Sequence, residues 1–240
     1  MKQKIRRIIN SRTVNGFIFT SFALSAAIVI ILLVYAPSIE SVAGGFGRVK
    51  SDYVLMLVQC VLGMFAMLLP GIFQKRLRVS IPSKMLLFYA LFLYCAIYLG
   101  EVRAFYYNIP HWDTILHTFS GVLLGTLGFS LITLLNKTDT IPIHLSPAFV
   151  ALFTLCFGVT LGVVWEFYEF FVDGMLQTNM QKYMLEGGEA LIGREALVDT
   201  MKDLIVDFIG AVFISVVGYI SLKYEKGWLD KLTVKFTHHG

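Results

Sequence analysis

The sequence predicts an all-α, polytopic membrane protein with about six transmembrane helices. Of its 240 residues, 57% are hydrophobic and only 15% are charged, whereas about a quarter of the residues in a soluble domain are charged. A helix needs roughly 20 consecutive apolar residues to cross a bilayer. The chain has six such runs, at about residues 17–35, 53–73, 85–106, 114–135, 147–172 and 204–222. We expect them to form a single integral membrane domain over residues 1–240.

The first apolar run is expected to be an uncleaved anchor. Basic residues precede it and Ser41-Val42-Ala43 follows it, which resembles the cleavage site of a secretory signal. Its length of about 19 residues exceeds the roughly 7–15 apolar residues of a signal core. The later runs are joined by short loops, except for residues 174–201 between the fifth and sixth. A loop of that length is often a lid or a partner surface, and the sequence leaves both open beside a plain surface excursion.

The basic residues predict the orientation of the helices. With both termini cytoplasmic, 14 of the 20 Lys and Arg residues lie on the cytoplasmic side and 6 lie outside, as the positive-inside rule requires. The acids follow the opposite pattern, with 13 of 16 outside or in the outer halves of helices. We therefore expect both termini to be cytoplasmic, and we expect the partner of the protein to be the lipid bilayer rather than nucleic acid. The oligomeric state is not indicated.

The fourth, fifth and sixth runs share one design. Residues four apart lie near one face of a helix, and on that face each run has ionisable residues near its outer end and glycines further in. The residues concerned are Asp113, His117, Gly121 and Gly125; Gly158, Gly162, Glu166, Glu169 and Asp173; and Asp199, Asp203, Asp207, Gly210 and Gly218. Small residues at this spacing let helices approach closely in lipid. We expect tight contact between the fourth and fifth helices, with an extracytoplasmic cleft where the three helices diverge.

The charge balance of this cleft indicates a bound cation or shared protons. Glu101 and seven acids of the last three runs face only two basic residues, Arg103 and Lys202. So many carboxylates cannot all stay ionised in a medium of low dielectric constant. Carboxylates with one imidazole suit Mg²⁺, Ca²⁺, Mn²⁺ or Zn²⁺. The predicted metal ligands are His117, Glu166, Asp203 and Asp207, and the rest of the candidate functional cluster is Glu169, Asp113, Asp173 and Asp199.

Helix capping is the competing explanation for three of these acids. Asp199 and Asp203 are expected in the first turn of the sixth helix and Asp113 at the start of the fourth, where the helix dipole favours carboxylates. We expect these three to support the site. Glu166, Asp207 and His117 lie too deep for capping to explain them.

Three segments resemble known families. They are His111-Trp112-Asp113-Thr114-Ile115-Leu116-His117; Trp165-Glu166-Phe167-Tyr168-Glu169 with Asp173; and Asp199-Thr200-x-x-Asp203-x-x-x-Asp207-x-x-Gly210-Ala211. In order and spacing they look like the YjdF-type bacterial inner-membrane proteins of unknown function. They are more distantly similar to VanZ-like proteins, which are associated with glycopeptide-antibiotic tolerance. Asp207 stands where the VanZ-like pattern prefers Asn, and Glu169 stands where Gln is usual.

Three classes of function are compatible with these residues. An extracytoplasmic enzyme could use a divalent cation on a lipid or cell-envelope substrate. A non-catalytic scaffold or binding protein could use the carboxyls to hold its helices together. A proton-coupled transporter could use them as a relay, but no inverted repeat is evident and the inner halves of the runs lack Asp, Glu and His. We rank the cation site first, and whether it is catalytic is left open.

Overall fold

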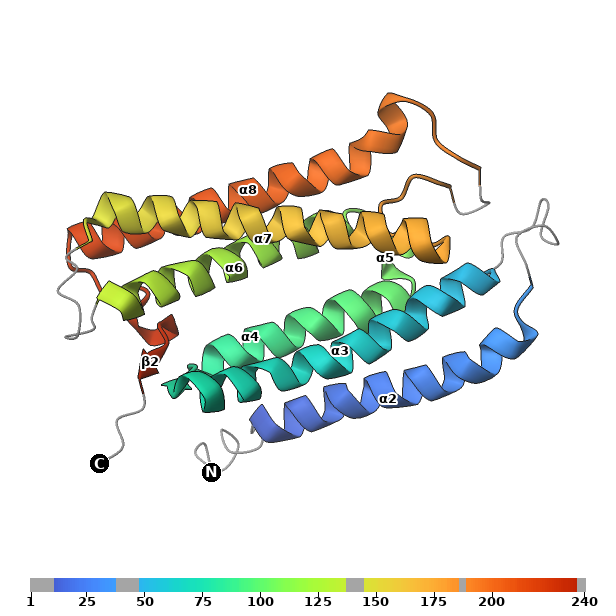
Figure 1. Ribbon diagram of the computed structural model, residues 1–240, viewed down its shortest axis with the longest axis horizontal. Coiled ribbons are helices and arrows are strands. Elements are labelled where there is room, and N and C mark those ends of the chain that lie inside the picture. The colour runs from blue at the N-terminus through green and yellow to red at the C-terminus, as the bar shows by residue number, and fades with distance from the viewer. Residues whose placement is uncertain (1–10, 38–47, 137–144, 186–188, 237–240) are drawn as a thin grey trace.

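The computed structural model describes residues 11–37, 48–136, 145–185 and 189–236 as a bundle of long, nearly antiparallel helices (Figure 1). In these ranges six helical segments are long and apolar enough to cross a membrane, which confirms the all-α prediction and the helix count. The cleavage sequence Ser41-Val42-Ala43 lies outside the described residues, as do residues 186–188 of the predicted long loop. The helices are α2 (Ser11–Tyr35), α3 (Lys50–Leu77), α4 (Ser83–Leu93) continued by the π-helix η2 (Tyr94–Val102), the short α5 (Phe105–Asn108), α6 (Trp112–Asn136), α7 (Pro147–Leu176) and α8 (Arg194–Lys223).

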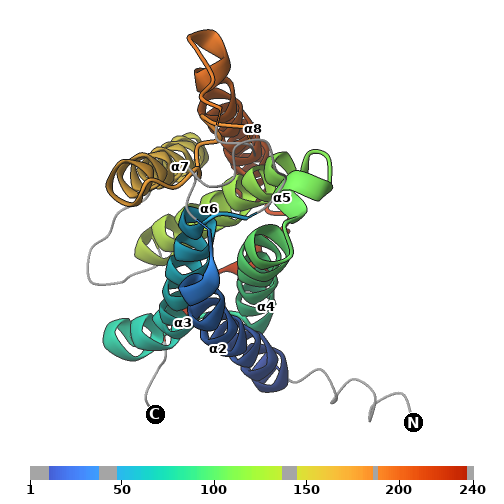
Figure 2. The ribbon, with the colours of Figure 1, turned by 90° about the vertical axis from the view of Figure 1, so that its right-hand side faces the viewer.

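The helices form two groups, which are seen end-on in Figure 2. In one group, α2, α3 and α4 with η2 pack around Phe22, Cys60 and Ile97. In the other group, α6, α7 and α8 pack on one another, with a core that includes Phe129 and Ile214. Large apolar side chains cover the outer faces, which is the pattern expected of surfaces that contact lipid.

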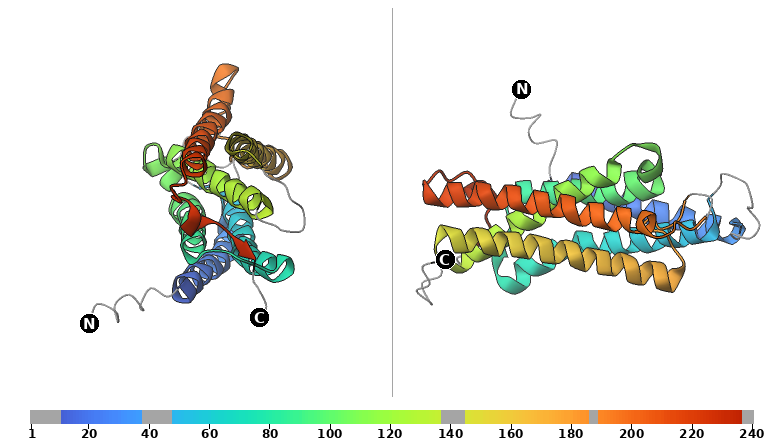
Figure 3. Two further views of the ribbon diagram at one scale, coloured as in Figure 1. Left: turned by 90° about the vertical axis from the view of Figure 1, so that its left-hand side faces the viewer. Right: turned by 90° about the horizontal axis from the view of Figure 1, so that it is seen from above.

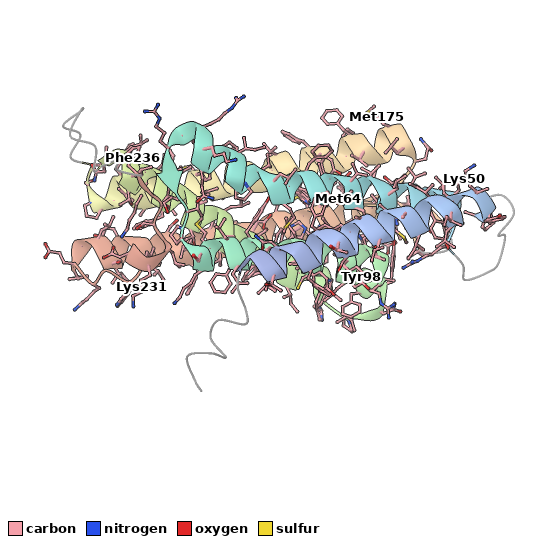
Figure 4. All side chains as sticks on the ribbon, turned by 90° about the horizontal axis from the view of Figure 1, so that it is seen from below. Lys50, Met64, Tyr98, Met175, Lys231 and Phe236 are labelled. Carbon is pink, nitrogen blue, oxygen red and sulfur yellow. The ribbon has the colours of Figure 1, made fainter. Side chains whose placement is uncertain are left out.

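The two ends of the bundle differ in charge. Lys50 and Met175 lie at one end, and Lys231 and Phe236 lie at the other (Figure 4). We call the first the acidic end, because the acids of α6, α7 and α8 lie in its half of the bundle. The opposite end is closed by the segment that follows α8, which contains the 3₁₀ turn η3 (Asp230–Leu232) and the strand β2 (Lys235–Phe236) (Figure 3, left). There β2 pairs with β1 (Val79–Ser80), so the C-terminal segment joins the two helix groups.

Several helix boundaries differ from the predicted runs by four residues or more. The helix α2 begins at Ser11 rather than at 17, and α3 and α7 end at Leu77 and Leu176 rather than at 73 and 172. The sixth span begins at Arg194, ten residues before position 204, because the polar first three turns of α8 remain helical outside the apolar run. The third span ends at Val102 instead of residue 106. There Ala104 adopts a left-handed conformation with φ 57°, which separates η2 from α5.

The glycines of α6 and α7 let these helices pack closely, and most of the close contacts are with α8. A Cβ added to Gly121 would lie 2.5 Å from the backbone oxygen of Asp207, and one added to Gly162 would lie 2.8 Å from the Asp207 carboxylate. Gly158 lies against Gly125, which supports the predicted contact between α6 and α7, and also against Ala211 of α8. The close packing therefore involves three helices rather than the predicted pair, and α8 is the common partner.

Candidate functional site

The site is centred on His117, in the second turn of α6. Its Nε2 lies 3.7 Å from Oδ1 of Asp113, one turn earlier on the same helix, and 3.7 Å from Oδ2 of Asp203 on α8. One ligand atom from each of these three residues lies within 4.8 Å of the others, so the group could hold a metal ion. His117 and Asp203 are buried, and Asp113 is partly buried.

The other imidazole nitrogen is held from the opposite side. Nδ1 of His117 lies 3.3 Å from Oδ2 of Asp207, whose Oδ1 accepts a hydrogen bond of 2.7 Å from Ser120 Oγ. When Nδ1 carries the proton and donates it to Asp207, the lone pair of Nε2 points toward Asp113 and Asp203. A carboxylate that orients the far nitrogen of a histidine is a recurring feature of metal sites. Asp207 was predicted as a ligand, but its position in the structure favours this orienting role.

Close helix packing produces this arrangement. Gly121 lies one turn after His117 and contacts the backbone of Asp207. Gly210 lies one turn after Asp207, and a Cβ there would be 2.7 Å from the backbone oxygen of Thr118. Because neither glycine has a side chain, α6 and α8 approach closely enough for an imidazole on one helix to reach a carboxylate on the other.

Capping explains only one of the three acids to which it was assigned. Asp113 lies in the first turn of α6 as expected. Asp199 and Asp203 lie in the second and third turns of α8, because the helix begins at Arg194, and Glu195 is the acid of its first turn. The expectation that both lie in the first turn was wrong. Moreover Asp113, expected only to support the site, belongs to the group that could hold a metal.

Glu166 and Glu169 of α7 have different surroundings. Glu166 is 4% exposed, and neither of its carboxylate oxygens has a hydrogen-bond partner among the described residues. Gln181 and Thr200, which hydrogen-bond each other at 3.1 Å, approach it without reaching hydrogen-bond geometry. Glu169 is also buried but accepts a 2.7 Å hydrogen bond from Trp165 Nε1. Glu166 is thus the acid of α7 most in need of a partner.

Asp173 organises a loop. Its carboxylate accepts hydrogen bonds from Thr178 Oγ1 at 2.6 Å and from the backbone nitrogens of Met180 and Gln181 at 2.8 and 2.9 Å. These bonds turn the chain back toward the bundle after α7 ends at Leu176. The loop between α7 and α8 is shorter than predicted, because both helices extend into the segment 174–201.

The loop carries a basic residue that the sequence interpretation did not place in the site. Lys182 Nζ donates to the backbone oxygen of Met180 at 3.1 Å and lies 4.9 Å from the centre of the Tyr106 ring. Burial alone would lower the pKa of Lys182. The negative charges of Asp113 and Asp199, with smaller contributions from other groups, raise it by more than burial lowers it, so the pKa lies above its ordinary value. A signal was available, because Lys182 is the only Lys or Arg between residues 174 and 193.

Tyr106 forms the surface beneath this lysine. Its ring packs against Gly100, where an added Cβ would lie 2.5 Å from a ring carbon. Burial raises the pKa of Tyr106, and the carboxylates of Asp113 and Glu101 raise it further. The phenol therefore stays neutral, and its ring can interact with the ammonium through a cation–π contact.

The site is buried rather than open. Asp203, Asp207 and Glu166 are 2%, 3% and 4% exposed, so the predicted open cleft is not present at these side chains. The structure brings together Asp113, His117, Asp203 and Asp207, and places Glu166 and Asp199 where they act electrostatically on that group. Of the predicted cluster, Asp173 is committed to the loop and Glu169 to Trp165.

Comparison with known proteins identifies the family. The model of a family described as "Predicted membrane protein (DUF2238)" matches residues 18–224. An uncharacterised protein from Thermotoga maritima is 29% identical over 154 residues, which is 62% of this chain and 69% of that protein. No solved structure matches. The match to the family model spans all six candidate transmembrane helices almost completely, and the chain belongs to the DUF2238 family of predicted membrane proteins.

Proposed function

We propose that this protein binds one divalent cation between Asp113, His117 and Asp203 and uses it on a lipid or cell-envelope substrate. We place the site on the outer side of the bacterial cytoplasmic membrane, with both termini in the cytoplasm. The observation that carries the proposal is the unsatisfied carboxylates around His117. Both oxygens of Glu166, Oδ1 of Asp203 and Oδ2 of Asp199 are buried without a hydrogen-bond partner among the described residues. Buried carboxylate oxygens are costly unless they are paired or bind a cation.

The spacing of the three ligands supports the cation. A hydrogen bond between nitrogen and a carboxylate is usually about 2.7–3.2 Å long and is not formed at about 3.6 Å or more, so the two 3.7 Å separations from Nε2 are too long for direct bonds. Two ligands each about 2.1 Å from a tetrahedral ion lie about 3.4 Å apart. The observed separations are close to that value. Asp207 is close enough to His117 for a hydrogen bond, which makes it an orienting residue rather than the fourth ligand.

The ligand set suits a hard or borderline ion. Two carboxylates with one imidazole are compatible with Zn²⁺, Mn²⁺, Ca²⁺ or Mg²⁺, and no described thiol approaches the group to favour a softer metal. A cation held there polarises a phosphoryl or carbonyl oxygen or activates water. Glu166, buried and unpartnered, is the residue we assign to accept a proton. The choice of a lipid or cell-envelope substrate follows from the proposed position of the site on the outer side of the membrane.

Two alternatives predict different behaviour. In a scaffold, His117 would be an imidazolium that ties Asp113, Asp203 and Asp207 together without metal. A proton-coupled transporter would need ionisable groups along the whole path. Residues 118–136, 147–165 and 208–222 contain no Asp, Glu, His, Lys or Arg. Such a relay would stop about halfway along these helices, which favours a site over a pathway.

Metal analysis of purified protein tests the proposal. Wild-type protein in detergent, after exposure to Zn²⁺ or Mn²⁺ and removal of free ion, should retain about one equivalent, and Asp203→Asn or Glu166→Gln should lower the retained amount. Glu195→Gln is the matched control, because this acid lies exposed at the start of the same helix as Asp203. Equal retention by wild type and the two site variants, or none by wild type, would leave the scaffold as the better explanation.

A further inference from the structure

A pocket lies at the end of the bundle opposite the acidic end. It has a volume of about 220 Å³ and is partly open at the surface. Figure 4 shows Lys231, one of its residues, at this end. The lining consists of Ser80, Pro82, Asp230, Lys231, Thr233 and Lys235. The pocket shares no residue with the group around His117, so what it binds is independent of the proposed metal function.

The two helix groups supply opposite walls of the pocket. Ser80 and Pro82 belong to the connection between α3 and α4, whereas residues 230–235 belong to the segment after α8. The pairing of Ser80 with Lys235 in the two short strands joins these walls. Seen end-on, the C-terminal segment runs from the end of α8 toward the first helix group (Figure 3, left). A molecule bound in the pocket would therefore contact both groups.

The bundle holds the C-terminal wall in a defined position. Leu229, directly before η3, is buried in the core that α6, α7 and α8 form. The backbone nitrogen of Trp228 donates to Ser221 Oγ at 3.0 Å, and the backbone nitrogen of Val234 donates to Ser130 Oγ of α6. The pocket is thus a fixed feature of the fold at this end.

The lining of the pocket carries a net positive charge. It contains two ammonium groups, Lys231 and Lys235, and one carboxylate, Asp230, which leaves a charge of +1. Oδ2 of Asp230 would be 2.7 Å from a Cβ added to Gly227, so this carboxylate lies against the turn that precedes η3. The net charge matches the single negative charge of a phosphodiester.

The surroundings of the pocket also attract anions. Residues 74–84 and 223–236 contain eight Lys or Arg residues and two acids. Pro82 is the N-cap of α4 and makes no side-chain hydrogen bond to the first turn, so the backbone N–H groups of that turn keep their partial positive charge. Basic pockets between transmembrane helices are suited to the headgroups of anionic lipids.

The level of the pocket favours a lipid over a soluble anion. The spanning helix α3 ends at Leu77, three residues before Ser80, and α8 ends at Lys223, a few residues before the C-terminal wall. Trp228 and Tyr224 are exposed at the same end, and such side chains are enriched where a membrane meets water. The pocket therefore lies at the level of phospholipid headgroups.

We propose that this pocket binds the headgroup of an anionic phospholipid, with Lys231 and Lys235 holding the phosphate, and that the bound lipid links the two helix groups. The ammonium groups form charge-assisted hydrogen bonds to phosphate oxygens, and the Ser80 hydroxyl supplies a further donor. Because the two walls come together only in the folded bundle, binding of the lipid stabilises the folded protein.

Lipid titration of the full chain tests this proposal. Wild-type protein in neutral detergent receives dioleoyl-phosphatidylglycerol or the same amount of dioleoyl-phosphatidylcholine, and the unfolding temperature and the bound lipid are measured, the latter by native mass spectrometry. Phosphatidylglycerol should stay bound and raise the unfolding temperature, and phosphatidylcholine should do neither. In Lys231→Gln/Lys235→Gln the affinity for phosphatidylglycerol should fall about tenfold or more. Lys75→Gln/Lys226→Gln removes two exposed charges from the same end outside the lining and is the matched control, which should bind nearly as wild type does.

Hydrogen exchange locates the bound lipid. In wild-type protein, phosphatidylglycerol should slow the exchange of backbone amides in β1 and β2, and in Lys231→Gln/Lys235→Gln it should not. Unchanged exchange in these strands, or unchanged affinity in that variant, would overturn the proposal. Equal loss of affinity in the control variant would also overturn it, because the whole basic end would then attract the lipid. The same would follow if inorganic phosphate raised the unfolding temperature as much as phosphatidylglycerol, because the pocket would then bind a soluble anion.

Discussion

Replacement of Gly121 by alanine should show how far the site depends on contact between helix backbones. The added Cβ would lie 2.5 Å from the Asp207 backbone oxygen and 3.0 Å from its Cα, whereas ordinary contact begins at about 3.4 Å. The helices α6 and α8 must therefore separate by about 0.9 Å, because a backbone atom cannot rotate away as a side chain can. Overpacking of this kind costs roughly 1–3 kcal/mol.

The same displacement should affect the site. Asp207 Oδ2 lies 3.3 Å from His117 Nδ1, and a shift of about 0.9 Å would bring the separation to about 4 Å, beyond hydrogen-bond reach. We expect Gly121→Ala to lower the free energy of unfolding in mixed micelles and to weaken metal retention. Gly71→Ala is the control, since Gly71 lies exposed in α3 with nothing within 4 Å of an added Cβ, and it should be neutral or slightly stabilising. Equal stability of the two variants would refute the packing argument.

Three further predictions concern orientation, the acids and pH. Reporter fusions after Leu77 and after Lys223 should report the cytoplasm, and a fusion within residues 189–193 should report the outside; reversed results would place the site in the cytoplasm. Glu166→Gln and Asp207→Asn should both lose metal while still folding; if these carboxyls only hold the helices together, the amides should be nearly silent and the alanine variants should cost roughly 1–3 kcal/mol of stability. The folded protein favours the charged form of Lys182 and raises its pKa above the ordinary value of 10.5. The stability that this charge contributes should therefore be complete below pH 10.5 and be lost only as the pH rises through the pKa of the folded protein. A stability difference between wild type and Lys182→Met that changes across neutral pH would contradict this.

The sequence predicted the helices well because length and apolar character determine a membrane span. It located the ends of spans poorly wherever a helix continues into polar residues, as α8 does before position 204. Hydropathy records where lipid begins, whereas backbone hydrogen bonding determines where the helix begins. That error changed the interpretation of Asp199 and Asp203, which would be helix caps at residue 204 but lie inside the helix that begins at Arg194.

The sequence could place the candidate residues on helix faces, but it could not determine which atoms of their side chains lie near one another. Four-residue spacing placed Asp113, His117, Asp203 and Asp207 on the correct faces, because the period of a helix determines a face. The spacing did not reveal which nitrogen of His117 each carboxylate approaches, since that depends on the rotation of α8 against α6. Lys182 was missed for a different reason. Its position follows from three hydrogen bonds to Asp173. A loop, unlike a helix, has no regular period from which the positions of its side chains can be predicted.

The glycines and the buried acids of the last three helices are physically connected. Glycines make α6 and α8 approach closely, and close approach removes water from the acids one turn away. Removal of water makes unpaired carboxylates costly, so the same packing that assembles the ligands creates the demand for positive charge. If the protein binds a cation as proposed, that binding and the contact between α6 and α8 should support each other, and a variant that weakens one should weaken the other.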